Sequence, residues 1–307
     1  MPRVSIGIPV YNGAHFLERS VRSVLEQDFQ DLEIIIADNA SSDATEPISK
    51  ELAAQDTRVR YYRNETNLGA SRNYNKVFEL ARGEYFKWQA HDDECHPAMI
   101  RRCVEFLDAA PPRVAMVYPL AELIDDHGKT ISVPLDRIEA RDHRPHRRLA
   151  RLMWELNMCD PVFGLIRSDY LRKTRLIGPF FGADYVLLAE LAMMGEIWEL
   201  DQVLFRLRAH AKRSIKANPG ARGVAAWYDP KAARKRFVLP NWERMVWESL
   251  RSARDSSLPF SSKVMCCAAI AGTHYWRRFR NAGGRLKSRL KASIGLDRRS
   301  AELAEPR

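Results

Sequence analysis

A regular alternation of strand and helix patterns, from Val4 to Tyr118, limits the possible folds of this chain more than any other feature. Short β-rich runs alternate with segments in which apolar residues recur every three or four residues, the spacing of a helix face. Strands are expected at 4–10, 32–37, 59–62, 85–88 and 114–118, with helices between them at 17–25, 43–54, 71–81 and 97–107. This alternation predicts a mostly parallel sheet with helices on both faces.

The rest of the chain follows a different pattern. Residues 126–129 are typical of a hairpin turn, and the apolar spacing predicts helices at 149–156 and 184–194 and strands at 162–166 and 197–200. From Lys231 onward the pattern is helical, with apolar stripes at 242–250 and 264–280. We therefore expect an α/β catalytic domain over residues 1–230 and a helical C-terminal extension over residues 231–307.

The positive charge of the chain belongs to this extension. The whole chain has a net charge of +10, whereas residues 231–307 hold 18 Lys and Arg against 6 Asp and Glu. A nearly neutral domain with a basic appendage argues against a protein that binds nucleic acid through its whole surface. Trp276 and Phe279 lie among the cations, so two interpretations stay open: a solvated helix face, or contact with an anionic membrane surface.

Neither an integral membrane protein nor a secreted one is expected. The best apolar run, 264–272, is nine residues long, against about 20 needed to cross a bilayer. The first residues lead directly into a strand and lack the pattern of a secretory signal. The five cysteines are odd in number and lack paired spacing, which argues against a disulfide framework or a zinc site. We expect a cytoplasmic protein that can lie at the inner face of a membrane.

Polar side chains follow three of the expected strands. In a sheet of this kind ligands bind beyond the carboxyl ends of the strands, which selects Tyr11, Asp38, Asp92 and Asp93. No glycine-rich loop of the dinucleotide or P-loop type is present. Tyr11 offers a ring for base stacking, Asp38 can accept hydrogen bonds from a base or ribose, and the aspartate pair supplies hard oxygens for Mg²⁺ or Mn²⁺. Because neighbouring side chains of an extended chain diverge, one of the pair should meet the metal.

Taken in order, these segments resemble a known family. Pro9-Val10-Tyr11-Asn12, then Glu33 to Asp43, then Asn67-Leu68-Gly69 and His91-Asp92-Asp93 are similar to the family 2 glycosyltransferases with the A-type nucleotide-diphospho-sugar fold. The resemblance covers about residues 3–210. It implies that Pro9, Tyr11, Asn12, Asp38 and Asn67 bind the nucleotide, most often a uridine. It also implies that Asp92, with Asp93, holds a Mn²⁺ or Mg²⁺ ion at the diphosphate.

Two later segments extend the resemblance. Phe181 to Leu191 is similar to the family's acidic motif at the start of a helix, which implies that Asp184 is the general base. Residues 206–210 are similar to its Arg/His motif, which implies that Arg208 lies near phosphate and that His210 is a further metal ligand. The chain departs from the family at Ala90 and Ala183, where acids are usual, and whether these substitutions impair activity stays open.

The predicted function is therefore a metal-dependent, inverting glycosyltransferase. It would move a sugar from a UDP-linked donor to a hydroxyl of a glycan or a lipid-linked acceptor. Structural roles compete, since Asp38, Asp92 and Asp184 could each cap a helix or favour its dipole. The alternatives are a nucleotidyltransferase, although its loop after the first strand would be rich in Gly and Arg, and a catalytically inactive protein that binds nucleotide sugars or nucleic acid. The identity of the sugar, the acceptor, the linkage and the oligomeric state do not follow from the sequence.

Overall fold

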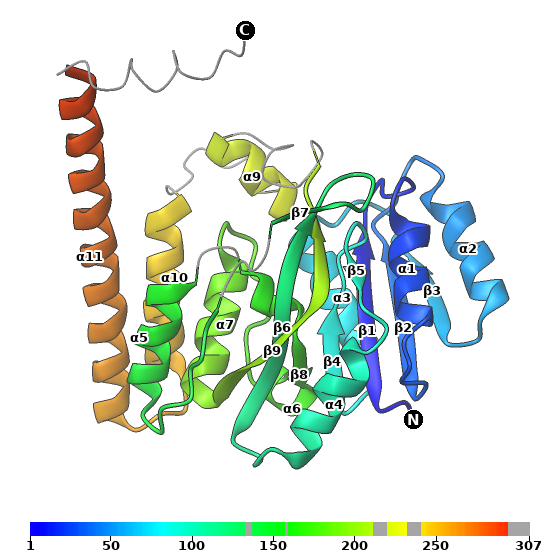
Figure 1. The fold of residues 1–307 in the computed structure, drawn as a ribbon, viewed down its shortest axis with the longest axis horizontal. Helices are drawn as coiled ribbons and strands as arrows, with labels where there is room; N and C mark the ends of the chain where they lie inside the picture. Colours follow the sequence, from blue (N-terminus) through cyan, green and yellow to red (C-terminus); the bar gives the residue numbers. More distant parts are fainter. Residues whose placement is uncertain (133–136, 157–158, 211–219, 232–240, 294–307) are drawn as a thin grey trace, which may run out of the picture.

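The computed structural model describes residues 1–132, 137–156, 159–210, 220–231 and 241–293, and the side chains of these residues except 221, 241 and 277–293. The strands form a nine-stranded sheet in the order β3-β2-β1-β4-β8-β6-β9-β5, with β7 paired to β6. Helices cover both faces of this sheet, and a group of long helices stands at one end of the molecule (Figure 1).

The first half of the chain builds the parallel part of the sheet, as predicted. Its strands are β1 (Val4–Val10), β2 (Leu32–Asp38), β3 (Val59–Arg63) and β4 (Tyr85–Trp88). The helices α1 (Leu17–Leu25), α2 (Thr45–Gln55), α3 (Ala70–Glu79) and α4 (Met99–Ala109) alternate with them. Every residue of β1 and β2 is buried, which explains their nearly continuous apolar runs, because a parallel strand covered on both faces has no solvent side.

The second half adds strands of both directions. β8 (Leu165–Arg167) is antiparallel to β4 and to β6 (Val114–Ile124). β9 (Glu196–Arg208) runs parallel to β6, and the short β5 (Glu94–Cys95) pairs antiparallel with the far end of β9. The hairpin of β6 with β7 (Thr130–Ser132) turns at Gly128, whose φ is 86°. Because β9 is long, its last residues reach the segment that follows β4, where β5 pairs with them.

Two expectations for this half are wrong in detail. The expected strand at 162–166 is a 3-10 helix, η1 (Asp160–Phe163), followed by the short β8. Cys159 takes a left-handed conformation (φ 60°) and Pro161 lies in the first turn of η1, and both favour a turn over a strand. The expected strand at 114–118 continues through Pro119 to Ile124, with register shifts against β9 around Pro119 and Leu120, where proline cannot donate to the ladder.

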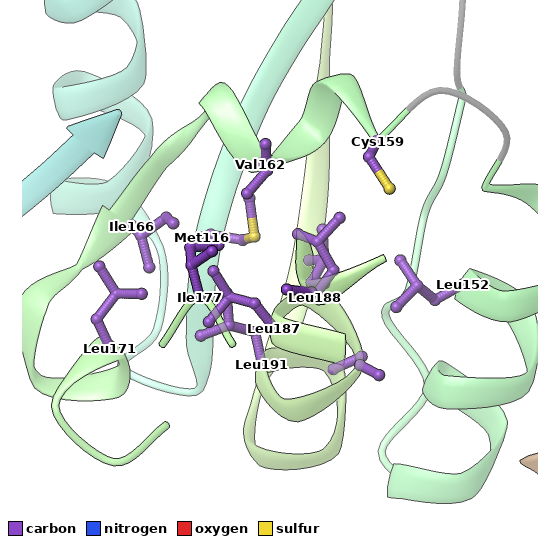
Figure 2. Packing of buried hydrophobic residues seen from close by; sticks show 14 of the residues in the cluster. Met116, Leu152, Cys159, Val162, Ile166, Leu171, Ile177, Leu187, Leu188 and Leu191 are labelled. Atoms are coloured by element: carbon purple, nitrogen blue, oxygen red, sulfur yellow. The ribbon is translucent and has the colours of Figure 1, made fainter. Parts of the chain in front are cut away.

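The remaining helices pack on one face of the sheet and on one another. They are α5 (Pro145–Glu155), α6 (Ser168–Leu171), α7 (Ala183–Met194), α9 (Gly220–Tyr228), α10 (Asn241–Asp255) and α11 (Phe260–Ser293). Nine of the twelve residues of α7 are buried, and Figure 2 shows Leu187 and Leu191 of this helix beside Met116 of β6. α10 packs on α7, and α11 packs on α5 and α10.

The helices of the C-terminal extension share a hydrophobic core with the sheet. Ala253 of α10 and Cys266 and Ile270 of α11 belong to the same buried cluster as Phe86 and Met116 of the sheet. A second cluster fills the other face, beneath α1 and α4. Among the helices in the described ranges, none combines the length and the apolarity needed to cross a bilayer.

Candidate functional site

The ends of β1, β2 and β4 meet at one edge of the sheet. The Asn39 amide donates to the carbonyl of Val10 (2.8 Å), and the Asn12 amide donates to Ser41 Oγ (2.9 Å), so the loops after β1 and β2 contact each other. A Cβ added at Gly13 would lie 2.5 Å from the ring of His91, so the loop after β1 also contacts the loop after β4. The three polar segments selected from the sequence therefore lie together.

The loop after β1 exposes an aromatic ring. The Tyr11 side chain is 47% exposed, although it lies beside a fully buried strand. Asn12 takes a left-handed conformation (φ 51°), and its Oδ1 accepts a hydrogen bond from the Ser42 amide (2.8 Å). Pro9 is buried within β1 and is paired with Ala37 of β2. Of the predicted nucleotide contacts in this segment, Tyr11 and Asn12 are thus exposed, whereas Pro9 is buried.

Asp38 is fully buried, and its carboxylate binds protein groups. Its Oδ1 accepts a hydrogen bond from the Ser41 amide (2.8 Å), while Oδ2 accepts from the Tyr61 hydroxyl (2.9 Å) and from Arg63 Nη1 (2.5 Å). Burial, together with the neighbouring Asp38, raises the pKa of Tyr61, which keeps this phenol a donor. In this geometry Asp38 joins the end of β2 to β3, and its contact with a nucleoside stays a prediction.

Asn67 likewise organises the backbone. Its Oδ1 accepts hydrogen bonds from Asn39 Nδ2 and from the Gly69 amide, each at 2.8 Å. Asn39 Oδ1 accepts in turn from the Leu68 amide (2.9 Å) and from Asn64 Nδ2 (3.1 Å). The loop after β2 is therefore tied to the loop before α3 by asparagines. The sequence analysis named Asn67 but neither Asn39 nor Asn64, and their concentration in the two loops is the signal that could have identified them.

Asp92 contacts His210, which lies 118 positions further along the chain. Asp92 Oδ2 lies 2.7 Å from His210 Nε2, and the side chains are 14% and 8% exposed. Burial alone would raise the pKa of Asp92, but the charge of His91 and the hydrogen bond from His210 outweigh it and lower the pKa to about 2. The carboxylate is therefore ionised at neutral pH. The predicted pair of metal ligands is brought together by the end of β9.

This donor set suits a hard divalent cation that also binds phosphate. A carboxylate oxygen and an imidazole nitrogen are both accepted ligands of Mn²⁺. The described part of the chain contains no group of three His, Cys, Asp or Glu side chains placed to hold a metal. The two protein ligands therefore fit an ion whose remaining positions are filled by diphosphate oxygens and water.

Asp93 and Arg208 bond to the backbone next to this pair. Asp93 is 4% exposed, and its Oδ1 accepts a hydrogen bond from the Arg208 amide (2.9 Å). The guanidinium of Arg208, also buried, donates to the carbonyls of Asp92 (2.9 Å) and Asp125 (2.7 Å) and to the Glu94 carboxylate. The two aspartates diverge, as predicted. The guanidinium of Arg208 holds the loop around Asp92, and its predicted place near a phosphate stays a prediction.

A buried lysine in β4 supports the loop that carries Asp92 and Asp93. Lys87 is fully buried, and its Nζ donates to Gln89 Oε1 (2.8 Å) and to the carbonyl of Trp88 (2.9 Å). Gln89 Nε2 donates to the carbonyl of Asp93 (2.8 Å) and to Ser20 Oγ (3.3 Å). Burial lowers the pKa of Lys87. The sequence analysis missed these residues, although a lysine and a glutamine within an otherwise apolar strand segment are a visible signal.

Asp184 lies on the first turn of α7. The preceding Gly182 has a φ of 77°, and Asp184 Oδ1 accepts a hydrogen bond from the Tyr185 amide (2.9 Å). Burial raises the pKa of the Asp184 carboxyl group, and hydrogen bonds from the backbone and from the Cys159 thiol oppose this effect in part. A carboxylate with a raised pKa is a better proton acceptor, which is the property a general base needs.

Tyr74 of α3 links the two halves of the site. Burial raises the pKa of its hydroxyl, and the negative charges of Asp92, Asp93 and Asp184 raise it further. Tyr228, at the end of α9, also has a raised pKa, through burial and the charge of Asp184. The carboxylates predicted for the donor side and for the acceptor side therefore act on the same phenol. Neither tyrosine was identified from the sequence.

The comparisons with known proteins settle the family. The model of "Glycosyl transferase family 2" matches residues 5–175, more than half of the chain. The chain belongs to glycosyl transferase family 2. The family match ends before Asp184 and His210, so it does not cover these two predicted site residues of the family 2 chain.

Two relatives of this family 2 chain are informative. An uncharacterized glycosyltransferase of Rickettsia typhi is 35% identical over 218 residues, which are 68% of this chain and 64% of that protein. The "GalNAc(5)-diNAcBac-PP-undecaprenol beta-1,3-glucosyltransferase" of Campylobacter jejuni is 37% identical over 95 residues, 31% of each protein. Among the Rickettsia relatives, the family 2 chain spans between 21% and 66% of their length.

Solved structures confirm the fold predicted for this family 2 chain. The crystal structure of S. aureus TarS 1–349 with UDP-GlcNAc has a TM-score of 0.61 at 16% identity and covers 90% of this chain and 73% of that one. The mannosyltransferase PcManGT from Pyrobaculum calidifontis, solved with GDP-Man and Mn²⁺, has a TM-score of 0.51 at 17% identity and covers 95% and 81%. At such identities the likeness concerns the fold alone.

Proposed function

We propose that this family 2 chain is a metal-dependent, inverting glycosyltransferase that moves a sugar from a UDP-linked donor to a hydroxyl of a glycan or a lipid-linked acceptor. The observation that carries the proposal is the contact of Asp92 with His210 at the sheet edge where Tyr11 is exposed. Because the loop that carries the Tyr11 ring contacts the loop that carries the Asp92 carboxylate, we expect one nucleoside diphosphate to reach both.

On the donor side, the Tyr11 ring stacks on the base, and Asp92 and His210 hold a Mn²⁺ or Mg²⁺ ion at the diphosphate. When bound, this ion neutralises negative charge on the departing diphosphate. Arg208 and Asp93 act indirectly: the Arg208 guanidinium donates to the Asp92 carbonyl and to the hairpin at Asp125, and so fixes the backbone that carries Asp92. Asp38 and Asn67 hold the neighbouring loops in the same indirect way.

On the acceptor side, Asp184 takes the proton of the attacking hydroxyl. The acceptor oxygen forms a bond to the anomeric carbon while the bond from that carbon to the diphosphate oxygen breaks, and the proton moves to the Asp184 carboxylate. A single displacement of this kind inverts the anomeric configuration. The raised pKa of Asp184 supports the assignment, because a proton transfer is more favourable to a more basic carboxylate.

The comparisons support the choice of donor and acceptor. TarS was crystallised with UDP-GlcNAc, and PcManGT with GDP-Man and Mn²⁺. The name of the C. jejuni relative describes a transferase that acts on an undecaprenol-linked glycan. We prefer UDP to GDP for this chain because a uridine donor is the commoner choice among the proteins that its motifs resemble.

Thermal unfolding with UDP, GDP or buffer, each with and without Mn²⁺, tests the proposal. A ligand present at 100 times its Kd stabilises the folded chain by about 2.7 kcal/mol, so UDP with Mn²⁺ should raise the Tm most. Asp92→Ala should remove the part of this shift that depends on Mn²⁺, and Asp126→Ala, a change at an exposed acid of the nearby hairpin, should not.

A UDP affinity that is the same with and without Mn²⁺ would contradict the metal assignment. An intact UDP shift without transfer of sugar to any acceptor would instead favour a catalytically inactive protein that binds nucleotide sugars.

A further inference from the structure

Large exposed apolar side chains gather on the C-terminal helices. Among the residues whose side chains are described, eleven large apolar ones are exposed, and seven of them lie on α5, α10 and α11. These seven are Trp154 (44%), Trp247 (51%), Phe260 (82%), Val264 (49%), Met265 (48%), Tyr275 (68%) and Trp276 (41%). Single exposed apolar residues are ordinary, but a group of this kind on one part of a protein marks an interaction surface.

The group continues along the outer side of α11. The inner side of this helix buries Cys266, Ile270 and Thr273 against its neighbours. The outer side carries Phe260, Val264, Met265, Tyr275 and Trp276, the last of which packs its ring on Trp154 of α5 (centroids 3.7 Å apart). No Asp, Glu, Lys or Arg occurs between residues 263 and 277. A helix at the surface of a soluble domain normally has a polar outer face. We call this set of five residues the outer face of α11.

The same helix has a strongly one-sided charge. α11 contains eight Lys and Arg residues and no Asp or Glu, and seven of the eight follow Trp276. In the sequence, Phe279, Leu286 and Leu290 continue the helical register of Val264 and Tyr275. α11 stands at the outer edge of the molecule, and its last turns extend past α5 and α10 (Figure 1).

We propose that the outer face of α11 lies on the surface of an anionic lipid bilayer. Apolar and aromatic side chains along one register, with a run of cations beside them, form the pattern of a helix that binds in the plane of a membrane interface. Phe260, Val264 and Tyr275 enter the boundary between head groups and acyl chains, and the cations lie against lipid phosphates. The helix lies along the bilayer and does not cross it, consistent with the lack of a spanning helix in the described ranges.

Charge favours a membrane over a second copy of the chain. A two-fold contact that overlapped the C-terminal halves of two α11 helices would bring together seven cations from each copy and no acid. Such a contact is repulsive, whereas a bilayer with anionic lipids attracts each cation. The proposal does not depend on the proposed glycosyl transfer, although a membrane position would bring the site close to lipid-linked acceptors.

Sedimentation with lipid vesicles tests the membrane contact. The full chain is mixed with vesicles of phosphatidylcholine alone or of phosphatidylcholine with phosphatidylglycerol, at physiological and at high salt. We expect binding to the anionic vesicles that weakens at high salt, and little binding to the neutral ones. Replacing Arg285, Lys287 and Arg289 by Glu should lower the affinity at least about 100-fold, since each cation near the surface contributes on the order of a fivefold increase.

A second variant separates the apolar contribution. Phe260→Ser with Tyr275→Ser should weaken vesicle binding at both salt concentrations. Ile131→Ser with Val203→Ser, which changes two exposed apolar residues far from α11 in the sequence, should not. The proposal would be overturned if the wild type bound neutral and anionic vesicles equally. It would also be overturned if Ile131→Ser with Val203→Ser lowered the affinity for vesicles as much as Phe260→Ser with Tyr275→Ser does.

Sedimentation velocity without lipid tests whether the outer face of α11 instead binds a second copy of the chain. A concentration-dependent dimer that Phe260→Ser with Tyr275→Ser dissociates would assign the face to a second copy and overturn the membrane proposal. The Tm shift with UDP and Mn²⁺ is measured on every variant: its retention shows a folded nucleotide site, so a failure of membrane binding is distinguishable from a failure of the proposed function.

Discussion

Asp184 is the residue whose substitution most directly tests the proposed chemistry. Asp184→Asn keeps the shape of the side chain and removes the proton acceptor, so kcat should fall by about 10²–10⁴-fold. Affinity for UDP with Mn²⁺, measured by calorimetry, should stay within about twofold, because the residue does not contact the donor. Asp169→Asn, at an exposed acid (side chain 83% exposed), serves as the control. Unchanged turnover of Asp184→Asn would refute the role.

The pKa of the same carboxyl group sets the pH dependence of turnover. The base must be ionised, and burial raises the pKa of Asp184 above the ordinary value of an aspartate. In a profile of kcat against pH, activity should therefore be lost on acidification at a higher pH than an exposed aspartate would give. A profile that stays flat down to the ordinary aspartate pKa would contradict this prediction.

Lys87 tests whether the loop around Asp92 and Asp93 depends on a residue that does not itself contact a ligand. Lys87→Met removes a donor to Gln89 Oε1 and to the Trp88 carbonyl. Gln89 Oε1 keeps the weak thiol donor of Cys95, and a buried acceptor that loses its donor costs about 1–3 kcal/mol. We expect a lower free energy of unfolding in urea. Because Gln89 also holds the Asp93 carbonyl, we further expect weaker UDP binding in the presence of Mn²⁺. Lys50→Met, at an exposed lysine, should leave both quantities unchanged.

At the scale of elements, the most informative contact is the one between α10 and the start of α7. Gly182 has a φ of 77°, and a Cβ there would lie 2.8 Å from Met245 Sδ of α10. Gly182→Ala should shift the turn that carries Asp184 and lower kcat more than tenfold. Gly128→Ala shares the positive φ (86°), but its Cβ would have no neighbour within 4 Å, so it should affect kcat little.

The pair of changes Gly182→Ala and Met245→Ala separates crowding from backbone strain. Removing the methionine side chain gives the new methyl group room, so the double variant should recover part of the lost kcat. A double variant that is no better than Gly182→Ala alone would show that the backbone conformation, and not the contact with α10, is responsible.

The elements of the first half were predictable because each strand is short, apolar and followed by a helix with its own stripe. β1 occupies the predicted residues 4–10, and β4 the predicted 85–88. The far part of β9 was not predictable, because residues 201–203 are exposed and the strand resumes its pairing with β6 only at Val203. Local pattern carries no information about a partner strand more than 80 residues away.

For the side chains of the site, too, the sequence predicted only part of the arrangement. The sequence indicated which segments converge, and the resemblance selected Asp92 and His210, which do contact each other. The sequence could not show that Arg208 donates to the carbonyls of Asp92 and Asp125. Every residue has a backbone carbonyl, so such hydrogen bonds cannot be inferred from the residue types. Nor could the sequence show that the Asp38 carboxylate bonds Tyr61 and Arg63, since these partners come from β3.

At the scale of the whole molecule, a buried ionic cluster joins the C-terminal helices to the sheet domain. Arg175 Nε lies 2.8 Å from Glu190 of α7, and its Nη1 lies 2.9 Å from Glu248 of α10. Both glutamates are nearly fully buried, and Glu248 is also paired with Arg244 (2.6 Å), so Arg175→Met should cost about 3 kcal/mol of unfolding free energy mainly by leaving Glu190 without its cation. Arg172→Met, which breaks the exposed pair with Asp169, should cost less than about 1 kcal/mol.

A single urea transition that shifts in Arg175→Met would show that the two parts unfold together. Two transitions, with only the C-terminal one shifted, would mean that α10 and α11 unfold independently of the sheet.

The shared core of α5, α7, α10 and α11 restricts how the chain could be re-engineered. A chimera that exchanged α10 and α11 for the tail of another transferase would inherit a mismatched surface around Ala253, Cys266 and Ile270. Grafting a new tail therefore requires the inward faces of α5 and α7 to be transplanted with it.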